Sequence, residues 1–304
     1  MTSLPPRSRS RSRAHGIARR LGPLPWIAPA VLLILAVVVW PVYEMVRTSF
    51  LRISTSGFVR GPAGFDKYRK LLDEPELGRV LLATVLWTVA VVGLTMLLSL
   101  ALAQLFDQSF PGRRFTRWAL IAPWAASVLM TSIGFRWMLD RTAGVLNTAL
   151  TDLGLVDGPR DWLGDPGTAW PWMVGVAVFV SLPFTTYTLL AGLQTVPAEV
   201  HEAARVDGAS PWQAYRRITL PLLRPAFLVG LVINLINVFN SFPVIWGMTQ
   251  GGPGSATATT TVFMYQLKNT DIGESAAMSV VNFALVVLMV LVFLKVSRWN
   301  REED

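Results

Sequence analysis

Long apolar segments constrain this chain more than any other feature of its sequence. An α-helix needs roughly 20 mostly apolar residues to cross a bilayer. Six segments meet or approach that length: Trp26–Tyr43, Val80–Phe106, Trp118–Phe135, Trp170–Leu193, Ala226–Met248 and Ala276–Leu294. Only 15% of the residues are charged, against roughly 25% in soluble domains. The sequence therefore predicts an all-α, polytopic membrane bundle with six transmembrane helices and no separate soluble domain.

The charges outside these segments predict how the chain is oriented. Residues 1–24 form a basic tail with six arginines between Arg7 and Arg20 and no acidic residue among them. A basic segment before a spanning helix stays in the cytoplasm near anionic lipid, so we assign this tail to membrane lipid and not to nucleic acid. We expect a multi-pass protein of the plasma (inner) membrane with both termini in the cytoplasm.

These features divide the chain into three parts. We expect a flexible basic tail (1–24), a six-helix transmembrane domain (25–298) and a short cytoplasmic tail (299–304). No small-residue cleavage site follows the first apolar segment, so we expect this segment to remain as an anchor.

The composition excludes several chemistries. The chain has no cysteine, so disulfides, thiolate catalysis and Cys-ligated metals are excluded. His15 and His201 are isolated, and the spans contain no paired carboxylates. We expect no catalytic residue and no metal site. The phosphate-loop pattern G-x-x-x-x-G-K-[ST] is missing as well, so we do not expect the chain to bind ATP itself.

A polar loop, residues 197–225, interrupts the hydrophobic sequence between the fourth and fifth apolar segments. Pro197 favours the start of a helix, which we expect to run to about Val206. Gly208 would then end it in a left-handed conformation. The sequence Ser-Pro-Trp-Gln at 210–213 is a capping-box pattern for a second helix, which we expect to end near Pro221. The two helices would form a compact knuckle on the cytoplasmic face.

The knuckle has the features of a docking element. Carboxylates at Glu202 and Asp207 would accept hydrogen bonds from a partner, and small residues would let its surface approach closely: Ala203, Ala204, Gly208 and Ala209. One alternative is an amphipathic loop that lies on the membrane. A second is a helix-turn-helix for DNA, which its attachment to two spanning helices disfavours.

The same residues carry a family resemblance. Glu202-Ala203-Ala204, followed at fixed spacing by Asp207-Gly208-Ala209, Leu220-Pro221 and Pro225, resembles the EAA signature of permease subunits of binding-protein-dependent ABC importers. The stretches "GFDKYRKLL", "LGLVDGPRDWLGDPGTAW" and "MTQGGPGSATATTTVFMYQ" are similar to the carbohydrate branch of that family. The last of them resembles the maltose-permease F-type subunit more than its G-type companion. Unlike the enteric maltose permease, this chain lacks two leading spans and a large outer domain.

The resemblance implies a function and a set of partners. It implies a non-enzymatic subunit that forms half of the pathway for a sugar or polyol in an ATP-binding-cassette importer. Its partners would be a second related permease, an extracytoplasmic solute-binding protein and a dimer of ATPase subunits, which would bind the ATP and magnesium. The coupling residues would be Glu202, Ala203, Ala204, Asp207, Gly208 and Ala209, inserted into a cleft of the ATPase.

The fifth apolar segment contains the candidate substrate pathway. Polar groups inside spans are unfavourable and need partners, yet Asn234, Asn237 and Ser241 recur at helical spacing with Asn240 beside them. Neutral amides and hydroxyls suit hydrogen bonding to sugar hydroxyls. Alternatively, these amides bind neighbouring helices together.

A self-sufficient secondary transporter of a small polar solute is the rival function. Such proteins often place charged or unwound sites at mid-membrane and contain inverted repeats. The six segments show no deep charge and no visible repeat, which favours the importer subunit.

Overall fold

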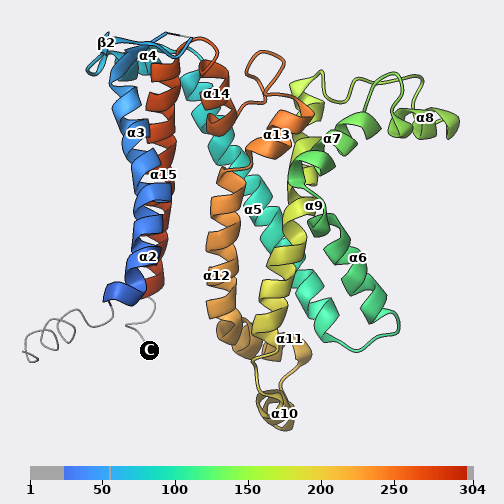
Figure 1. Ribbon diagram of the computed structural model, residues 1–304. Coiled ribbons are helices and arrows are strands. Elements are labelled where there is room, and N and C mark those ends of the chain that lie inside the picture. Colours follow the sequence, from blue (N-terminus) through green and yellow to red (C-terminus); the bar gives the residue numbers. More distant parts are fainter. Residues whose placement is uncertain (1–23, 55, 300–304) are drawn as a thin grey trace, which may run out of the picture.

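Long helices that stand side by side form this protein, as seen in the computed structural model (Figure 1). The structure describes residues 24–54 and 56–299, so the predictions for the tails at 1–23 and 300–304 lie outside the described residues. The helices are α2 (Leu24–Ile34), α3 (Trp40–Ser49), α4 (Asp66–Asp73), α5 (Leu77–Asp107), α6 (Arg113–Ala125), α7 (Val128–Met138), α8 (Val145–Asp152), α9 (Pro166–Leu193), α10 (Ala198–Val206), α11 (Pro211–Ala214), α12 (Leu220–Phe239), α13 (Phe242–Met248), α14 (Thr260–Leu267) and α15 (Ile272–Trp299).

Five stretches of the described chain are long and apolar enough to cross a membrane. They are Trp26–Ser49, Leu77–Asp107, Pro166–Leu193, Pro211–Phe239 and Ile272–Lys295. Each overlaps one of the six predicted segments, so the helical membrane bundle is confirmed.

The third predicted span is not a single helix. Trp118–Phe135 is divided between α6 and α7, of 13 and 11 residues, and neither reaches the roughly 20 residues that a span requires. Ser127 interrupts the helix with an extended backbone (φ −62°, ψ 133°) and stands at the N-cap of α7, a position that serine favours. A hydropathy profile alone does not reveal a helix break of this kind.

Two π-helical segments, η1 (Leu35–Val39) and η2 (Tyr215–Thr219), precede prolines inside spans. Pro41 and Pro221 each follow two residues after such a segment. A proline in a helix donates no backbone hydrogen bond and clashes with the carbonyl four residues earlier, and for Pro41 and Pro221 that residue lies in the π-helical segment. The predicted helix end near Pro221 is therefore wrong, because α11, η2 and α12 form one continuous helix.

A small hairpin corrects the all-α prediction. Strands β1 (Leu51–Ile53) and β2 (Val59–Pro62) pair antiparallel at the end of the bundle opposite α10, next to α4 (Figure 1). The fold is therefore mostly helical with one short two-stranded sheet.

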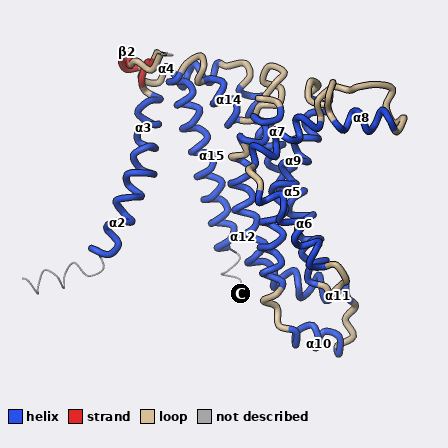
Figure 2. Tube along the Cα trace, turned by 45° about the vertical axis from the view of Figure 1, so that its right-hand side comes forward, coloured by secondary structure: helices blue, strands red, loops and turns tan. Residues whose placement is uncertain are grey.

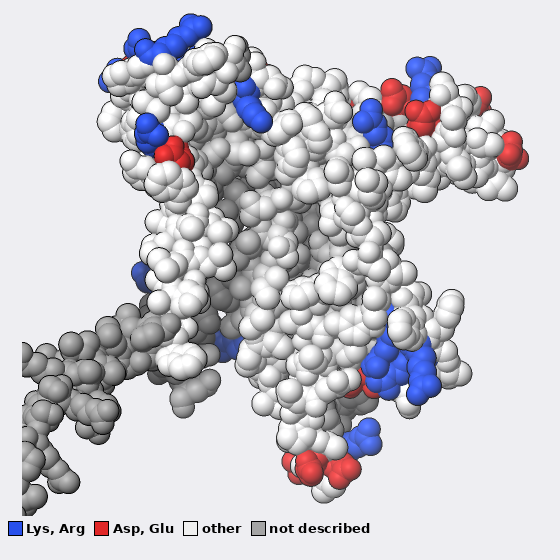
Figure 3. Space-filling view, in the orientation of Figure 1, with Lys and Arg blue, Asp and Glu red and all other residues white. Residues whose placement is uncertain are grey.

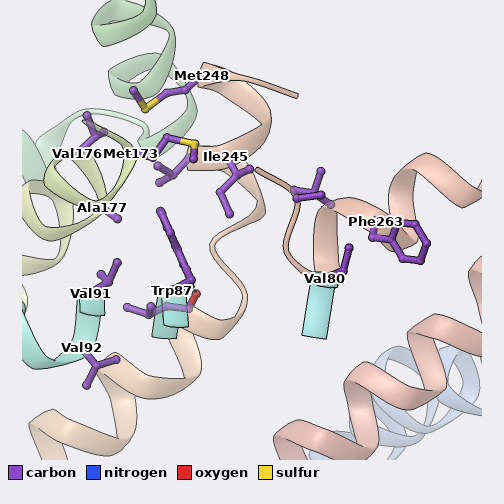
Figure 4. Packing of buried hydrophobic residues seen from close by; sticks show 14 of the residues in the cluster. Val80, Trp87, Val91, Val92, Met173, Val176, Ala177, Ile245, Met248 and Phe263 are labelled. Atoms are coloured by element: carbon purple, nitrogen blue, oxygen red, sulfur yellow. Dashed lines mark hydrogen bonds between the residues drawn. The ribbon is translucent and has the colours of Figure 1, made fainter. Parts of the chain in front are cut away.

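The core lies where α5, α9 and α13 meet. Figure 4 shows Trp87 of α5 pointing toward Met173 of α9 and Ile245 of α13, and all three side chains are buried. A second cluster joins α5, α9 and α12 at the end nearest α10 through Ala103, Phe106, Leu189, Leu190, Leu193 and Leu223. The two clusters make these helices one packed unit.

Ion pairs join α4, which follows the first span, to the last span at the end of the bundle opposite α10. Lys70 of α4 binds Glu274 of α15 (2.6 Å), and Lys67 binds Asp271 beside it. The hydrogen bond to Glu274 holds the pKa of Lys70 above its usual value. Ser49, at the end of α3, lies 2.7 Å from the Tyr68 hydroxyl of α4. Toward the other end α2 diverges from the remaining helices (Figure 2), and α2 and η1 bury no described residue.

Gly192 allows α9 and α12 to approach closely near the end of the bundle that carries α10. A Cβ atom on Gly192 would lie 2.3 Å from the Cβ of Ala226 and 2.9 Å from Leu223. We predict that Gly192→Ala lowers the thermal unfolding midpoint of the detergent-solubilised protein, because overpacking costs about 1–3 kcal/mol. Gly175→Ala in the same helix is the control, since its Cβ would meet no atom within 4 Å. Equal midpoints for the two variants would contradict this packing.

Candidate functional site

The loop between α9 and α12 is a rigid two-helix knuckle. Gly208 adopts a left-handed conformation (φ 76°), and its N–H donates to the Arg205 carbonyl (3.1 Å) while the N–H of Ala209 donates to that of Ala204 (2.9 Å). This pair of bonds is a Schellman motif, which closes the end of α10. Ser210 and Gln213 form the predicted capping box at the start of α11. The predicted end of α10, the left-handed Gly208 and the capping box are confirmed, whereas the second helix continues past Pro221 into α12.

The predicted coupling residues occupy different positions on this knuckle. Glu202, Ala203, Asp207 and Gly208 are exposed, Ala209 is half-buried, and Ala204 is buried. In Figure 1 α10 projects beyond the ends of the long helices, and Figure 3 shows acidic side chains gathered at its tip. Ala204 therefore supports the knuckle from inside, a role that its place in the motif does not reveal.

A cavity of about 430 Å³ lies between α7, α9, α12 and α13. All four predicted pathway residues line it: Asn234, Asn237, Asn240 and Ser241. Their arrangement differs from the predicted stripe, because α12 ends at Phe239 and the last two residues lie in the break before α13. The break, and not a continuous helical face, brings Asn240 and Ser241 to the cavity.

The three asparagines have different environments. Asn234 is buried (3% exposed), and its Nδ2 has no hydrogen-bond partner among the described residues. Asn237 is exposed. Asn240 donates from Nδ2 to the carbonyl of Ile236 (3.0 Å). Asn234 and Asn237 make no side-chain hydrogen bond among the described residues, and Asn240 makes one through Nδ2 alone, so all three amides have groups that could bind a solute.

Trp87 holds the break between α12 and α13, and sequence reasoning missed it. Its indole Nε1 donates to the Oγ of Ser241 (2.7 Å) and to the carbonyl of Val238 (3.2 Å). The Ser241 hydroxyl itself donates to the Val238 carbonyl (2.7 Å). Ser241 thus fixes the backbone beside the cavity. The sequence did contain a signal for this contact. A tryptophan inside an apolar span has an N–H group that needs a hydrogen-bond partner.

Other cavity residues come from α6 and α9. Trp124 precedes the break after α6, and Ser181 and Thr185 lie one helical turn apart on α9. Thr185 donates to the carbonyl of Ser181 (3.1 Å). No Lys, Arg, His, Asp or Glu is among the described residues that line this cavity. Its chemistry is that of amides, hydroxyls and apolar groups.

Comparison with known proteins identifies the family. The family described as "Binding-protein-dependent transport system inner membrane component" matches residues 79–300. The chain belongs to this family. The permease is thus the membrane component of an ABC transporter and not itself an ATPase, and its predicted family is confirmed.

Relatives and a solved structure show the extent of the likeness. The permease is 35% identical to the sulfoquinovosyl glycerol transport system permease protein SmoG of Agrobacterium fabrum, covering 90% of this chain and 89% of that protein. It is 32% identical to the trehalose/maltose transport system permease protein MalF of Thermococcus litoralis, over 91% and 93%. Its fold matches a chain in the crystal structure of a bacterial alginate ABC transporter in complex with an alginate pentasaccharide-bound periplasmic protein (TM-score 0.78, 21% identity, covering 94% and 97%).

Replacing Trp87 should destabilise the non-helical turn between α12 and α13. We predict that Trp87→Phe lowers the thermal unfolding midpoint, because two hydrogen bonds of about 1 kcal/mol each are lost and the Val238 carbonyl loses a donor. Trp137→Phe is the matched control, because Trp137 is 72% exposed. The measurement is thermal unfolding of both purified variants, and an unchanged midpoint for Trp87→Phe would show that the indole does not hold the break.

Proposed function

We propose that this permease forms one half of the translocation pathway of an ABC importer for a neutral sugar or related polyol. The observation that carries the proposal is the uncharged cavity at the α12–α13 break, with the Asn234 amide unpartnered among the described residues. A sugar offers hydroxyl groups that both donate to and accept from such amides. SmoG and MalF, named for a sulfoquinovosyl glycerol and a trehalose/maltose transport system, support the carbohydrate class.

The proposal includes six crossings with both termini in the cytoplasm. In it, α6 and α7 cross the membrane together as one broken span. The break at Ser127 then adjoins the cavity, because Trp124 before it and Val128 after it both line that cavity. A non-helical backbone at membrane depth is tolerated where it lines a cavity.

In our proposal, the ATPase subunits move the permease by pushing on the knuckle. In our proposal α10 docks in a cleft of an ATPase dimer, which binds the ATP and magnesium, through Glu202, Ala203, Asp207 and Gly208, with Ala204 and Ala209 supporting them. The position of α10, beyond the ends of the long helices in Figure 1, supports this docking. The helix from Pro211 to Phe239 connects the knuckle directly to the cavity, so movement of one displaces the other.

Two further partners complete the proposed complex. The first span has exposed apolar side chains along α2 and η1, which a second related permease would cover in a heterodimer. An extracytoplasmic solute-binding protein would deliver the solute, by analogy with the periplasmic protein in the alginate transporter complex.

Gly208 tests the coupling. We predict that Gly208→Pro abolishes uptake and the recovery of an ATPase with the tagged permease, because proline cannot adopt a φ of 76°. Gly208→Asn should retain both, since asparagine tolerates this conformation and a Cβ there meets no atom within 4 Å. Mass spectrometry of co-purified proteins is the measurement. Recovery of the ATPase with the proline variant would contradict the assignment, and ATP-independent flux by the permease alone would favour a secondary transporter.

Asn234 distinguishes a pathway role from a role in binding helices together. An unsatisfied buried amide costs about 1–3 kcal/mol, so we predict that Asn234→Leu keeps or raises the thermal unfolding midpoint while it lowers ATP-dependent uptake. Radiolabelled trehalose and maltose are the first probes. Asn282 of α15 is the control, because its Nδ2 donates to the Thr260 carbonyl (3.2 Å) and Asn282→Leu should lower the midpoint. A lowered midpoint for Asn234→Leu would assign that amide to helix packing.

A further inference from the structure

A lateral arm between α7 and α9, residues 139–165, carries the short helix α8. Figures 1 and 2 show α8 lying across the direction of the long spans, at the level where α7 ends. In both views the segment that returns from α8 to α9 lies on the outward side of the helix, away from the bundle. α8 is therefore the layer of the arm nearest the membrane.

Asn147 hydrogen-bonds the segment that returns from α8 to α9, and so shows which face of α8 this segment covers. Its Nδ2 donates to the carbonyl of Arg160 (2.9 Å), and its Oδ1 accepts from the Arg160 N–H (3.1 Å) and the Trp162 indole (2.9 Å). Nδ2 also donates to the Asp140 carbonyl (3.0 Å). Asn147 is only 4% exposed. The outward side of α8 is thus the Asn147 side.

The opposite face of α8 has three exposed apolar residues, with the carboxylate of Asp152 beside them at the last residue of the helix. Val145, Ala149 and Leu153 follow at intervals of four, and Val145 and Ala149 each lie two residues from Asn147, about 200° around a helix. Val145 and Leu153 are both 71% exposed, and Leu155, just beyond, is 67% exposed. This face, Val145–Ala149–Leu153, points away from the returning segment.

The charged side chains of the arm are also distributed unevenly between its two sides. In Figure 3 the charged side chains of the arm lie on its outward side and at its tip, and the underside seen in this view is uncharged. The exposed Trp137 stands at the base of the arm, near the end of α7. Tryptophan is enriched where a chain leaves the bilayer.

We propose that α8 is an interfacial anchor whose Val145–Ala149–Leu153 face inserts into the lipid headgroup region beside the bundle. In the orientation proposed above this is the outer leaflet. Lipid is the occupant because the apolar face is on the membrane side of the arm, whereas a soluble protein would approach the charged outward side. A helix with one apolar and one polar face binds the interface in this way.

The anchor would act on the cavity wall. The arm starts directly after α7, which contributes Val128 to the cavity. Insertion of α8 would fix the depth of α7 in the membrane, so that movement of α12 and α13 changes the cavity while α7 stays in place.

Single cysteines test the anchor directly, because the chain has none of its own. Leu153→Cys places a label on the proposed lipid face. Thr151→Cys is the matched control, since Thr151 lies four residues after Asn147, on the outward face, and is also exposed. The full-length variants are labelled with bimane in phosphatidylglycerol-containing nanodiscs, and quenching by brominated lipid is compared with quenching by iodide.

We expect brominated lipid to quench the label of Leu153→Cys several-fold more than that of Thr151→Cys, and iodide to show the reverse. Equal quenching of both labels, or stronger iodide quenching of Leu153→Cys, would overturn the proposal and leave the face free for a soluble partner. The measurement requires no transport, so its outcome is separate from that of the uptake experiments.

Discussion

A bilayer supplies no water to a free backbone group, so every break in a spanning helix has to be satisfied by the protein. The break between α12 and α13 meets this requirement through Trp87. One indole N–H contacts both the Ser241 hydroxyl and the Val238 carbonyl, and the same ring packs in the core between α5 and α9. The core therefore stabilises the non-helical turn that gives the cavity its polar groups.

The position of this break relative to the knuckle gives the permease its mechanical organisation. One helix runs from Pro211 to Phe239, a length of about 40 Å at 1.5 Å per residue. Its first turn is closed by the Ser210–Gln213 capping box, and its last turn lies at the cavity. The π-helical segment before Pro221 preserves this continuity.

Sequence reasoning predicted the parts of this architecture that depend on local chemistry. Five spans follow from hydropathy, and the left-handed Gly208 and the capping box follow from residue preferences at helix ends. The breaks at Ser127 and Asn240 were not predicted, because each lies inside a segment whose overall hydropathy is that of a single span. Trp87 escaped notice for a different reason: its role depends on a contact with Ser241, 154 residues away. The four pathway residues were identified by composition, but tertiary structure decides which of them have free hydrogen-bonding groups.

Charged side chains lie at both ends of the long helices, and the cavity between those ends is lined by uncharged residues in the part of the chain that the structure describes. Acidic side chains gather at the tip of α10, and the ion pairs of Lys67 and Lys70 with α15 lie at the opposite end. Between them, the described residues that line the cavity include no titratable group. A proton gradient acts on a transporter through groups that gain and lose protons in the pathway. In the function proposed above, the energy for transport reaches this cavity through movement of the helices, and the helix from Pro211 to Phe239 connects it to the knuckle.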